Sequence, residues 1–477
     1  MSSPSRETSR WLVLILVCFA QFMVVVDATV VNVALPSIQA DLGFSAADLQ
    51  WVVNGYTLVF GGFLLLGGRA ADLLGRKRLF LGGLALFTFA SALNGLATSQ
   101  EMLVGARALQ GLGAAMVSPA ALSIITTTFE DGPERTRALG IWSGIIAGGA
   151  AFGLLLGGVL TEALSWPWVF FVNVPVGIAV GVAALRYVAE SRTDEQGGFD
   201  LAGAITVTSG LTLLTYAIVK AQEWGWAGTN TLVLGGLALA LLGAFVAIER
   251  RASSPLVQLR IFSIRTLSVA NGVMLLIGGA LFSMFFFGSL YVQDVLGFSP
   301  LESGLAFLPM SIGIAIGAGT AQSLIGRVGV KPVALGGMLL ATAGMVLMTG
   351  VSADGSYVSD VLPGIVLIAI GMGNVFVPLT LAATTNVDDD HAGLASGIFN
   401  TSQQIGGALG LAILSTLAAD RTAAVGGDTA NAMVEGFQTA FLVGAGMMAV
   451  GAIALAVLLR QRDVAHISAA DAIPVPA

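Results

Sequence analysis

The sequence predicts an all-α polytopic membrane protein with fourteen transmembrane helices. Of its 477 residues, 56% are hydrophobic and only 10% are charged, whereas soluble proteins carry about 25% charged residues. The apolar residues form continuous runs of the length that a helix needs to cross a bilayer, about 20 residues. Membrane strands would show shorter, alternating segments. This composition excludes a soluble enzyme, a nucleic-acid-binding protein and a fibrous or disordered chain.

Fourteen runs satisfy this length criterion. The first follows Arg6 and Arg10 and is too long for the core of a cleaved signal peptide. The predicted spans are 11–35, 51–68, 79–98, 102–127, 138–161, 168–186, 201–219, 230–248, 266–292, 303–325, 332–350, 360–384, 393–419 and 438–459.

The basic residues support this number of spans. If the N-terminus is cytoplasmic and the sides alternate, eighteen of the 21 lysines and arginines lie on the cytoplasmic side. Lys220 and Arg421 lie outside, and Arg107 lies within a span. Because cytoplasmic loops are enriched in basic residues, we expect a protein of the cytoplasmic membrane with both termini inside.

The chain contains an internal duplication. Leu-Gly-Phe-Ser occurs at 42–45 and again at 296–299, and the loop 68–76 aligns with 319–327. Two parallel six-helix copies are typical of secondary transporters that bind substrate between the copies, although a channel or sensor could also be duplicated. The predicted units are a first bundle, two inserted helices, a second bundle and a cytoplasmic tail, at 1–192, 193–262, 263–463 and 464–477.

Asp27 is the most informative residue of the first span. A carboxylate in the hydrocarbon region costs about 2.5–3.5 kcal/mol on insertion scales, so it needs a partner, a cavity or a function. It lies about nine residues before Pro36, roughly 13 Å from the outer end. Arg107 in the fourth span lies at a similar depth, so the two can meet. The pair is either a proton-binding site or a static ion pair, and Gln110 either joins this network or lines a cavity.

The fifth span is rich in glycine at helical spacing. Small residues at this spacing allow two helix backbones to approach closely, either to slide or to pack statically. The glycines assigned to this contact are Gly149, Gly153, Gly157 and Gly158.

The loop between the second and third spans combines glycines, an acid and a basic run. Asp72 could cap a helix or pair with an arginine, and so form a latch between the bundles; a simple positive-inside anchor would explain only the basic residues. The latch candidates are Gly68, Asp72, Gly75, Arg76 and Lys77.

Amide side chains are the main polar residues of the remaining spans. Asn400, Gln403 and Gln404 share one helical face, which either lines a cavity or forms a hydrogen-bonded seam. The candidates for the substrate cavity are Asn54, Gln110, Asn271, Asn374, Asn400, Gln403 and Gln404.

The sequence offers little for catalysis or metal binding. Cys18 is the single cysteine, and the two histidines, His391 and His466, lie in polar segments. There is no phosphate-binding loop of the ATPase type and no acid–base or nucleophile constellation. We therefore expect no enzyme activity, no cofactor, no metal and no nucleic-acid partner, and energy that comes from a gradient.

Four motifs resemble the fourteen-span drug:proton antiporter branch of the major facilitator superfamily. They are VVVDATVVNVALP at 24–36, GRAADLLGRKR at 68–78, RALQGLGAA at 107–115, and the glycine series of the fifth span followed by WPWVFFVNVP at 166–175. Two positions differ from the usual motifs: Leu73 replaces a basic residue, and Leu154 replaces a proline.

The resemblance implies a proton-coupled exporter of hydrophobic drugs, antibiotics or related compounds, acting as a monomer in the lipid bilayer by alternating access. Asp27 and Arg107 would then carry proton coupling. The alternatives are a proton-independent or metabolite-importing facilitator of the same fold, and a receptor or scaffold that does not transport.

Overall fold

The computed structural model describes residues 4–129, 132–191, 200–252, 255–384, 387, 392–426 and 430–465. In these ranges the chain is helical, and fourteen helical spans are long and apolar enough to cross a membrane. The predicted number of spans is confirmed. His391, His466 and most of the predicted tail lie outside the described residues.

The helices are α1 (Pro4–Leu42), α2 (Trp51–Leu74), α3 (Arg76–Gly95), α4 (Gln100–Thr128), α5 (Pro133–Ala163), α6 (Trp168–Phe171), α7 (Asn173–Tyr187), α8 (Leu201–Trp224), α9 (Thr229–Glu249), η1 (Leu259–Ser263), α10 (Arg265–Leu290), η2 (Tyr291–Val295), α11 (Pro300–Ala306), α12 (Leu308–Val328), α13 (Val330–Met348), η3 (Tyr357–Val361), α14 (Leu362–Thr384), α15 (Ala392–Val425), α16 (Ala430–Leu458) and α17 (Gln461–Val464). A non-helical residue divides two spans, one into α6 and α7 and the other into α11 and α12; two further spans combine an α-helix with a π-helical turn, α10 with η2 and η3 with α14.

The two halves repeat the same packing. In the first half α1 packs on α5, α4 packs on both α2 and α3, and α3 packs on α7. In the second half α10 packs on α15, α14 packs on both α12 and α13, and α13 packs on α16. Each second-half pair is the parallel counterpart of a first-half pair. Two six-helix bundles related in parallel therefore form the fold, with α8 and α9 as the inserted pair.

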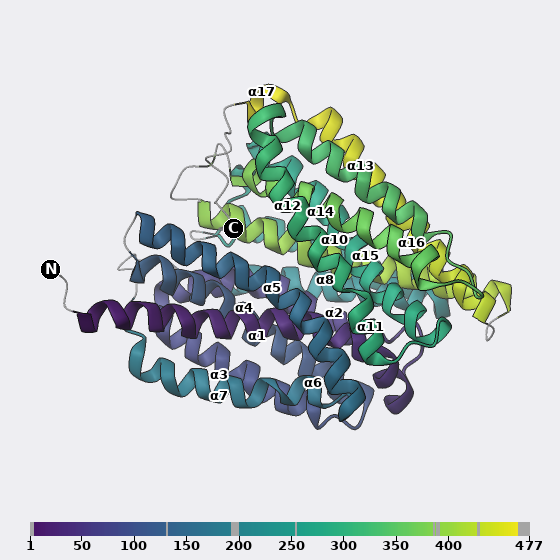
Figure 1. Ribbon diagram of the computed structural model, residues 1–477, viewed down its shortest axis with the longest axis horizontal. Helices are drawn as coiled ribbons and strands as arrows, with labels where there is room; N and C mark the ends of the chain where they lie inside the picture. The colour runs from purple at the N-terminus through teal and green to yellow at the C-terminus, as the bar shows by residue number, and fades with distance from the viewer. Residues whose placement is uncertain are drawn as a thin grey trace.

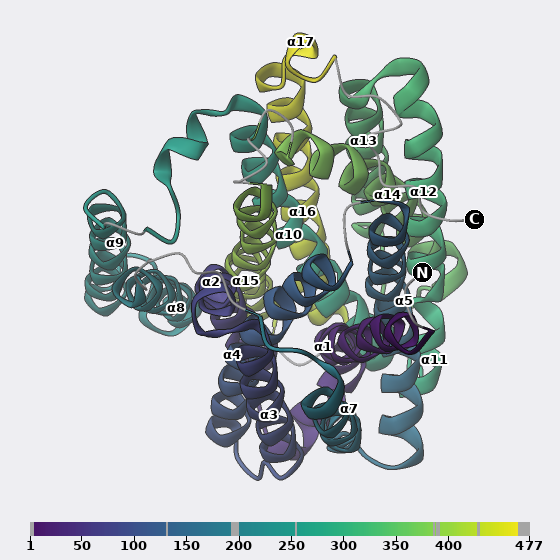
Figure 2. The ribbon, with the colours of Figure 1, turned by 90° about the vertical axis from the view of Figure 1, so that its left-hand side faces the viewer.

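We call the side where α1 begins and α16 ends the terminal side, and the opposite side the far side. Figure 1 shows the bundle of α1–α7 and the bundle of α10–α16 approaching each other near α6 and α11 and diverging toward the terminal side. In Figure 2, which looks from the terminal side, α8 and α9 lie to one side, next to α2.

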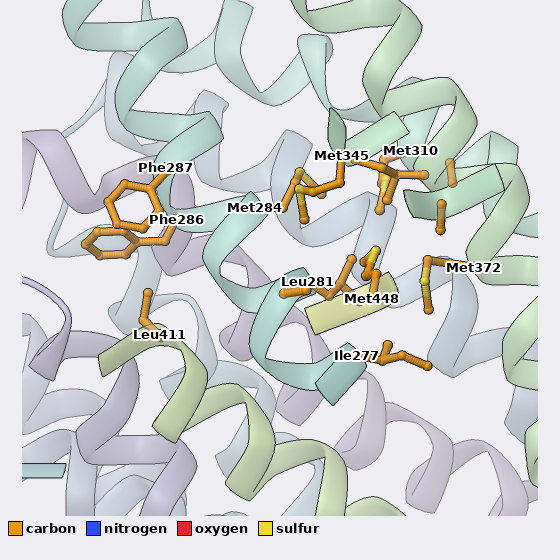
Figure 3. Packing of buried hydrophobic residues seen from close by; sticks show 14 of the residues in the cluster. Ile277, Leu281, Met284, Phe286, Phe287, Met310, Met345, Met372, Leu411 and Met448 are labelled. Atoms are coloured by element: carbon orange, nitrogen blue, oxygen red, sulfur yellow. The ribbon is translucent and has the colours of Figure 1, made fainter. Parts of the chain in front are cut away.

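Sulfur-containing side chains fill much of the second bundle. Met284 of α10, Met345 of α13 and Met448 of α16 are almost completely buried, and Figure 3 shows them with Met310 and Met372 around one segment of α10. Methionine is flexible and polarisable, so it fills irregular space between helices. These methionines thus let the helices of the second bundle pack closely against one another.

Candidate functional site

Asp27 and Arg107 form a fully buried ion pair inside the first bundle. Nη1 of Arg107 lies 2.6 Å from Oδ2 of Asp27, and the side chains are 0% and 1% exposed. The expected meeting of α1 and α4 at this depth is therefore present. A paired and hydrogen-bonded charge is tolerated in such a place, whereas a lone charge is not.

Two amides complete the coordination of the carboxylate. Nε2 of Gln110 donates to Oδ1 of Asp27 at 2.7 Å, and Nδ2 of Asn173 donates to the same oxygen at 2.9 Å. Asp27 therefore accepts three hydrogen bonds, one of them from a cation. Because a protonated carboxyl group would have to donate a hydrogen bond from one of these oxygens, the arrangement fits the ionised form.

Gln110 is held in this orientation by its own neighbours. Its Oε1 accepts from Nδ2 of Asn94 at 2.8 Å and from Nη1 of Arg107 at 2.7 Å, and its Nε2 also donates to Oγ of Ser91 at 2.7 Å. Gln110 is 0% exposed. It belongs to the Asp27 network in this structure, which is one of the two roles that the sequence left open, and a role in a substrate cavity stays a prediction.

Arg107 is also held by a backbone carbonyl group and by an aromatic ring. Its Nε donates to the carbonyl oxygen of Val52 at 2.9 Å, and its guanidinium lies 4.4 Å from the ring centre of Tyr56. Both partners belong to α2. A cation over an aromatic face gains about 2 kcal/mol or more when desolvated, so Arg107 can remain in place if Asp27 changes charge.

Sequence reasoning missed Asn173 as part of this site. It is the first residue of α7, directly after the break that follows α6, and it is 2% exposed. The available signal was a single amide between Val172 and Val174 in an apolar run. That signal gives no partner, because Asn173 and Asp27 are 146 positions apart.

The glycines of α5 form a seam along α1. A Cβ atom at Gly149 would lie 3.1 Å from Cγ1 of Val25, and one at Gly157 would lie 2.7 Å from the carbonyl oxygen of Val30. At Gly153 it would lie 3.0 Å from the carbonyl oxygen of Val26 and would collide with Oγ1 of Thr29. Gly158 faces α11 of the other bundle instead, 2.6 Å from the carbonyl oxygen of Pro300.

This seam supports a stability prediction. We expect Gly153→Ala to lower the free energy of unfolding by about 1–3 kcal/mol, as overpacking does in protein cores. Gly148→Ala is the matched control on the same helix, because a Cβ atom there meets nothing within 4 Å. Thermal unfolding of the two purified variants measures the difference, and equal stabilities would contradict a close α1–α5 contact.

The loop 68–78 is organised within the first bundle. Asp72 pairs with Arg76 at 3.0 Å, so its expected pairing with a nearby arginine is present. The cap of α3 comes from Glu190, whose carboxylate accepts from the backbone amides of Lys77 at 3.1 Å and Arg78 at 3.2 Å. Gly75 has a φ of +107° and lies against Glu190, where a Cβ atom would come within 2.6 Å of Oε1. Asp72 is therefore not the helix cap, and the latch residues described here contact their own bundle.

Backbone contacts join the two bundles at the far side. Oγ of Ser289 donates to the carbonyl oxygen of Asn32 at 2.8 Å, and Nε2 of Gln293 donates to that of Val33 at 3.0 Å. Oε2 of Glu162 accepts from the backbone amide of Leu301 at 3.0 Å. Helix α1 thus takes part both in the Asp27 network and in the hydrogen bonds that join the two bundles at the far side.

A cavity of about 280 Å³ lies on the terminal half of the second bundle, between α10, α14 and α15. Asn400 and Gln403 line it, as the sequence suggested for this face. None of the described lining residues is charged; they are Met274, Phe376, Thr380, Ala383, Thr384, Ser396, Phe399, Asn400 and Gln403.

Two of the other amides contact a neighbouring helix, and a third bonds within its own helix. Asn271 accepts from Oγ of Ser402 at 2.9 Å, which joins α10 to α15. Asn54 is fully buried in the first bundle and donates to Gln50 at 3.2 Å. Gln404 faces α2, where its Cβ lies 2.9 Å from the position of a Cβ at Gly61. In this structure none of the three lines the cavity that contains Asn400, and their role as substrate-cavity residues stays a prediction.

Asn374 both bonds to a neighbouring helix and borders a pocket. It donates to the carbonyl oxygen of Ile370 at 2.9 Å and hydrogen-bonds with Thr320 of α12. It also borders a separate pocket of about 170 Å³ between α12 and α13. It does not line the cavity that contains Asn400.

Comparisons with known proteins agree with this architecture. Residues 17–411 match the family model described as Major Facilitator Superfamily. The chain is 43% identical to the cephamycin export protein CmcT of Amycolatopsis lactamdurans, over 88% of this chain and 87% of that protein. It is 39% identical to the puromycin resistance protein pur8 of Streptomyces alboniger, over 99% and 95% of the two chains.

Solved structures share the fold at low identity. A bacterial homologue of the lysosomal transporter Spinster, in an inward-facing conformation, has a TM-score of 0.67 at 17% identity and covers 97% of this chain and 99% of its own. The POT family transporter PepTSo has a TM-score of 0.69 at 16% identity, with the same coverage.

Fold and relatives define a multi-pass membrane transporter rather than an enzyme. The chain belongs to the Major Facilitator Superfamily, whose members carry small organic substrates across membranes, and its relatives include exporters of antibiotics.

Proposed function

We propose that this protein is a proton-coupled exporter that removes hydrophobic organic compounds from the cytoplasm by alternating access. The observation that carries the proposal is the buried Asp27 carboxylate, held by Arg107, Gln110 and Asn173. A titratable group at this depth, surrounded by side chains that can rearrange, is the element that proton coupling requires.

The terminal side is the cytoplasmic side in this proposal. The basic loop 76–78 lies there, and the count of basic residues in the sequence favours the same orientation. The far-side hydrogen bonds then close the outer face, and the cavity between α10, α14 and α15 lies in the cytoplasmic half of the second bundle. The structure thus corresponds to the state that loads substrate.

The cavity favours uncharged or singly charged cargo. Its described lining combines aromatic and methionine side chains with two amides and several hydroxyl groups. These groups bind apolar surface and single hydrogen bonds, while a dication would lack a counter-charge. The antibiotics named in the relatives, cephamycin and puromycin, are therefore suitable first candidates.

Helix α1 can transmit protonation to the outer face. Asp27 and Asn32 are five residues apart, or about 7.5 Å along a helix. Neutralising Asp27 removes its attraction to Arg107 and leaves an amide donor of Gln110 or Asn173 without its acceptor. The hold of α1 on α4 and α7 then weakens, and α1 can shift along the glycine seam of α5. Such a shift displaces the carbonyl groups that Ser289 and Gln293 bind.

The cycle follows from these contacts. A proton from outside neutralises Asp27, substrate leaves outward, and the proton later returns to the cytoplasm as the Arg107 pair forms again. We propose that the moving units are the two bundles, 1–192 and 263–463. One charge that moves through 100 mV supplies about 2.3 kcal/mol, which corresponds to roughly fiftyfold accumulation.

Transport into everted membrane vesicles tests the proposal. Energised vesicles that contain the protein should accumulate at least one compound of an antibiotic panel, and a protonophore should release it. Uptake that follows only the gradient of the compound and ignores the protonophore would favour an uncoupled facilitator. Binding without any flux would favour a receptor.

A further inference from the structure

A second pair of acids lies at the terminal ends of the inserted helices. Asp200 precedes α8 and Glu249 ends α9, and they are 7% and 4% exposed. Neither belongs to the Asp27 network, which lies within the first bundle. The proposed transport cycle does not use them.

Each of these carboxyl groups has one oxygen with a donor and one without. Oδ1 of Asp200 accepts from the backbone amide of Gly203 at 2.6 Å, and Oε2 of Glu249 accepts from that of Val257 at 3.1 Å. Oδ2 of Asp200 and Oε1 of Glu249 are buried and have no hydrogen-bond donor in the described part of the chain. A buried acceptor without a donor costs about 1–3 kcal/mol, so two of them require an explanation.

The two oxygens without donors face the same point. A Cβ atom at Gly203 would lie 2.6 Å from Oδ2 of Asp200 and 2.8 Å from Oε1 of Glu249. Glycine at this position leaves the space between them open. One proton on one of these oxygens would donate to the other, so it would satisfy both at once. Two charged carboxylates in this place would repel each other.

The helix ends indicate which acid holds the proton. Asp200 caps the N-terminus of α8, where the helix dipole stabilises a negative charge. Glu249 lies at the C-terminus of α9, where the dipole opposes one. A shared proton is therefore better placed on Glu249, whose hydroxyl would donate to Oδ2 of Asp200.

The acid pair borders an apolar cluster that joins both bundles. The cluster contains Leu256 and Val257 of the segment after α9, Ala204 of α8, Leu267 of α10, and Ala395 and Ile398 of α15, with Phe63 and Leu65 of α2 packed against it. Because Glu249 binds the backbone of Val257, it ties the inserted helices to the segment that enters the second bundle.

We next consider the other charged groups in the described parts of the elements around the acid pair, which are α2, α9, α10 and the segment between α9 and α10. Arg250, Arg251 and Arg260 are exposed. Arg265 of α10 donates to the carbonyl oxygen of Leu458, and Asp72 of α2 pairs with Arg76. The remaining charge near this end of α2 is Arg69. Asp200 is the charged side chain that faces Glu249.

We propose that Asp200 and Glu249 form a second proton-binding site, independent of Asp27, in which one shared proton holds the inserted helices against the joint between the bundles. Loss of this proton places two negative charges face to face in apolar surroundings. The ends of α8 and α9 then separate, and the hold on Val257 weakens. The inserted helices thus become a pH-sensitive connection between the two bundles on the terminal side.

The experiment uses the purified full-length protein in the Asp27→Asn background, without substrate, so its result does not depend on transport. Infrared difference spectra during an alkaline titration should show the carbonyl band of a protonated carboxylic acid disappearing, with release of about one proton per molecule. Glu249→Gln should lack this band and this proton. Its amide can donate to Asp200 in place of the hydroxyl. Asp200→Asn should lack the band as well, because its amide can donate to an ionised Glu249.

Thermal unfolding gives a second measurement. The melting temperature should fall as the pH rises above about 4.3, the pKa of an unperturbed glutamate, because the folded protein still binds a proton that the unfolded chain has lost. In Glu249→Gln this fall should be absent. Glu223→Gln, at the far-side end of the same helix pair and 65% exposed, is the control and should behave like its parent. A titrating band that survives in Glu249→Gln, or melting curves that change in parallel with pH, would overturn the proposal.

Discussion

Asp27→Asn is expected to abolish the active accumulation of transported compounds while the protein remains folded and inserted. Asparagine has nearly the same shape as aspartate, and its carbonyl oxygen can still accept hydrogen bonds from Arg107, Gln110 or Asn173. It cannot bind and release a proton. The roughly fiftyfold accumulation that one charge supports at 100 mV should therefore fall to equilibration.

Accumulation is measured in everted vesicles whose membrane contains the variant, and the amount of protein and its melting temperature are recorded in parallel. Asp48→Asn is a suitable control, because Asp48 is a partly exposed acid at the far side that bonds to Ser45. Passive exchange of the compound should persist in Asp27→Asn, since the cavity lies in the other bundle. Undiminished accumulation in this variant would remove Asp27 from energy coupling.

Arg107→Ala is expected to destabilise the protein by about 3–5 kcal/mol, because it leaves a buried carboxylate without its counter-charge. The carboxylate keeps two amide donors, Gln110 and Asn173, but loses its cation. The pH dependence of substrate binding should also shift, because Arg107 no longer opposes protonation of Asp27. Thermal unfolding and binding titrations over a range of pH measure these two effects.

The double variant Asp27→Asn/Arg107→Ala separates the ion pair from simple packing. When both charges are absent, no charge remains to be desolvated, so the double variant should be more stable than Arg107→Ala alone. Strictly additive losses, with an unaltered pH profile of binding, would show that the two charges do not interact.

The fold and the centre of the site could be predicted from local features of the sequence. Run lengths and basic residues gave the number of spans. The depths of Asp27 and Arg107 in their spans predicted that they meet. The length of a span and the depth of a residue within it are both distances along a helix, and the sequence determines such distances through the rise per residue.

The partners contributed by distant helices could not be predicted in the same way. Asn173 reaches Asp27 because α7 starts anew after a break, and Glu190 caps α3 from a segment more than one hundred residues away. Helical spacing identifies the polar face of α15 that contains Gln404 and locates Asn54 and Asn271 within their spans. Whether such a face meets a cavity or a neighbouring helix depends on how the bundles tilt, which no local pattern records.

The structure also defines what the transport cycle must change. Asp27 has no exposed surface in this state, so the proposed proton exchange requires a second arrangement in which water reaches α1 from outside. The glycine seam with α5 and the two far-side carbonyl groups place α1 where such a movement would open the outer face.

Proton counting on the purified transporter is the decisive measurement. When a compound identified in the vesicle assay is added to protonated protein in weak buffer, we predict release of about one proton per molecule bound, and none from the matched asparagine variant at position 27. If wild type and variant liberate equal amounts, or if neither does while both still bind, the acid in the first membrane helix does not exchange its proton for cargo.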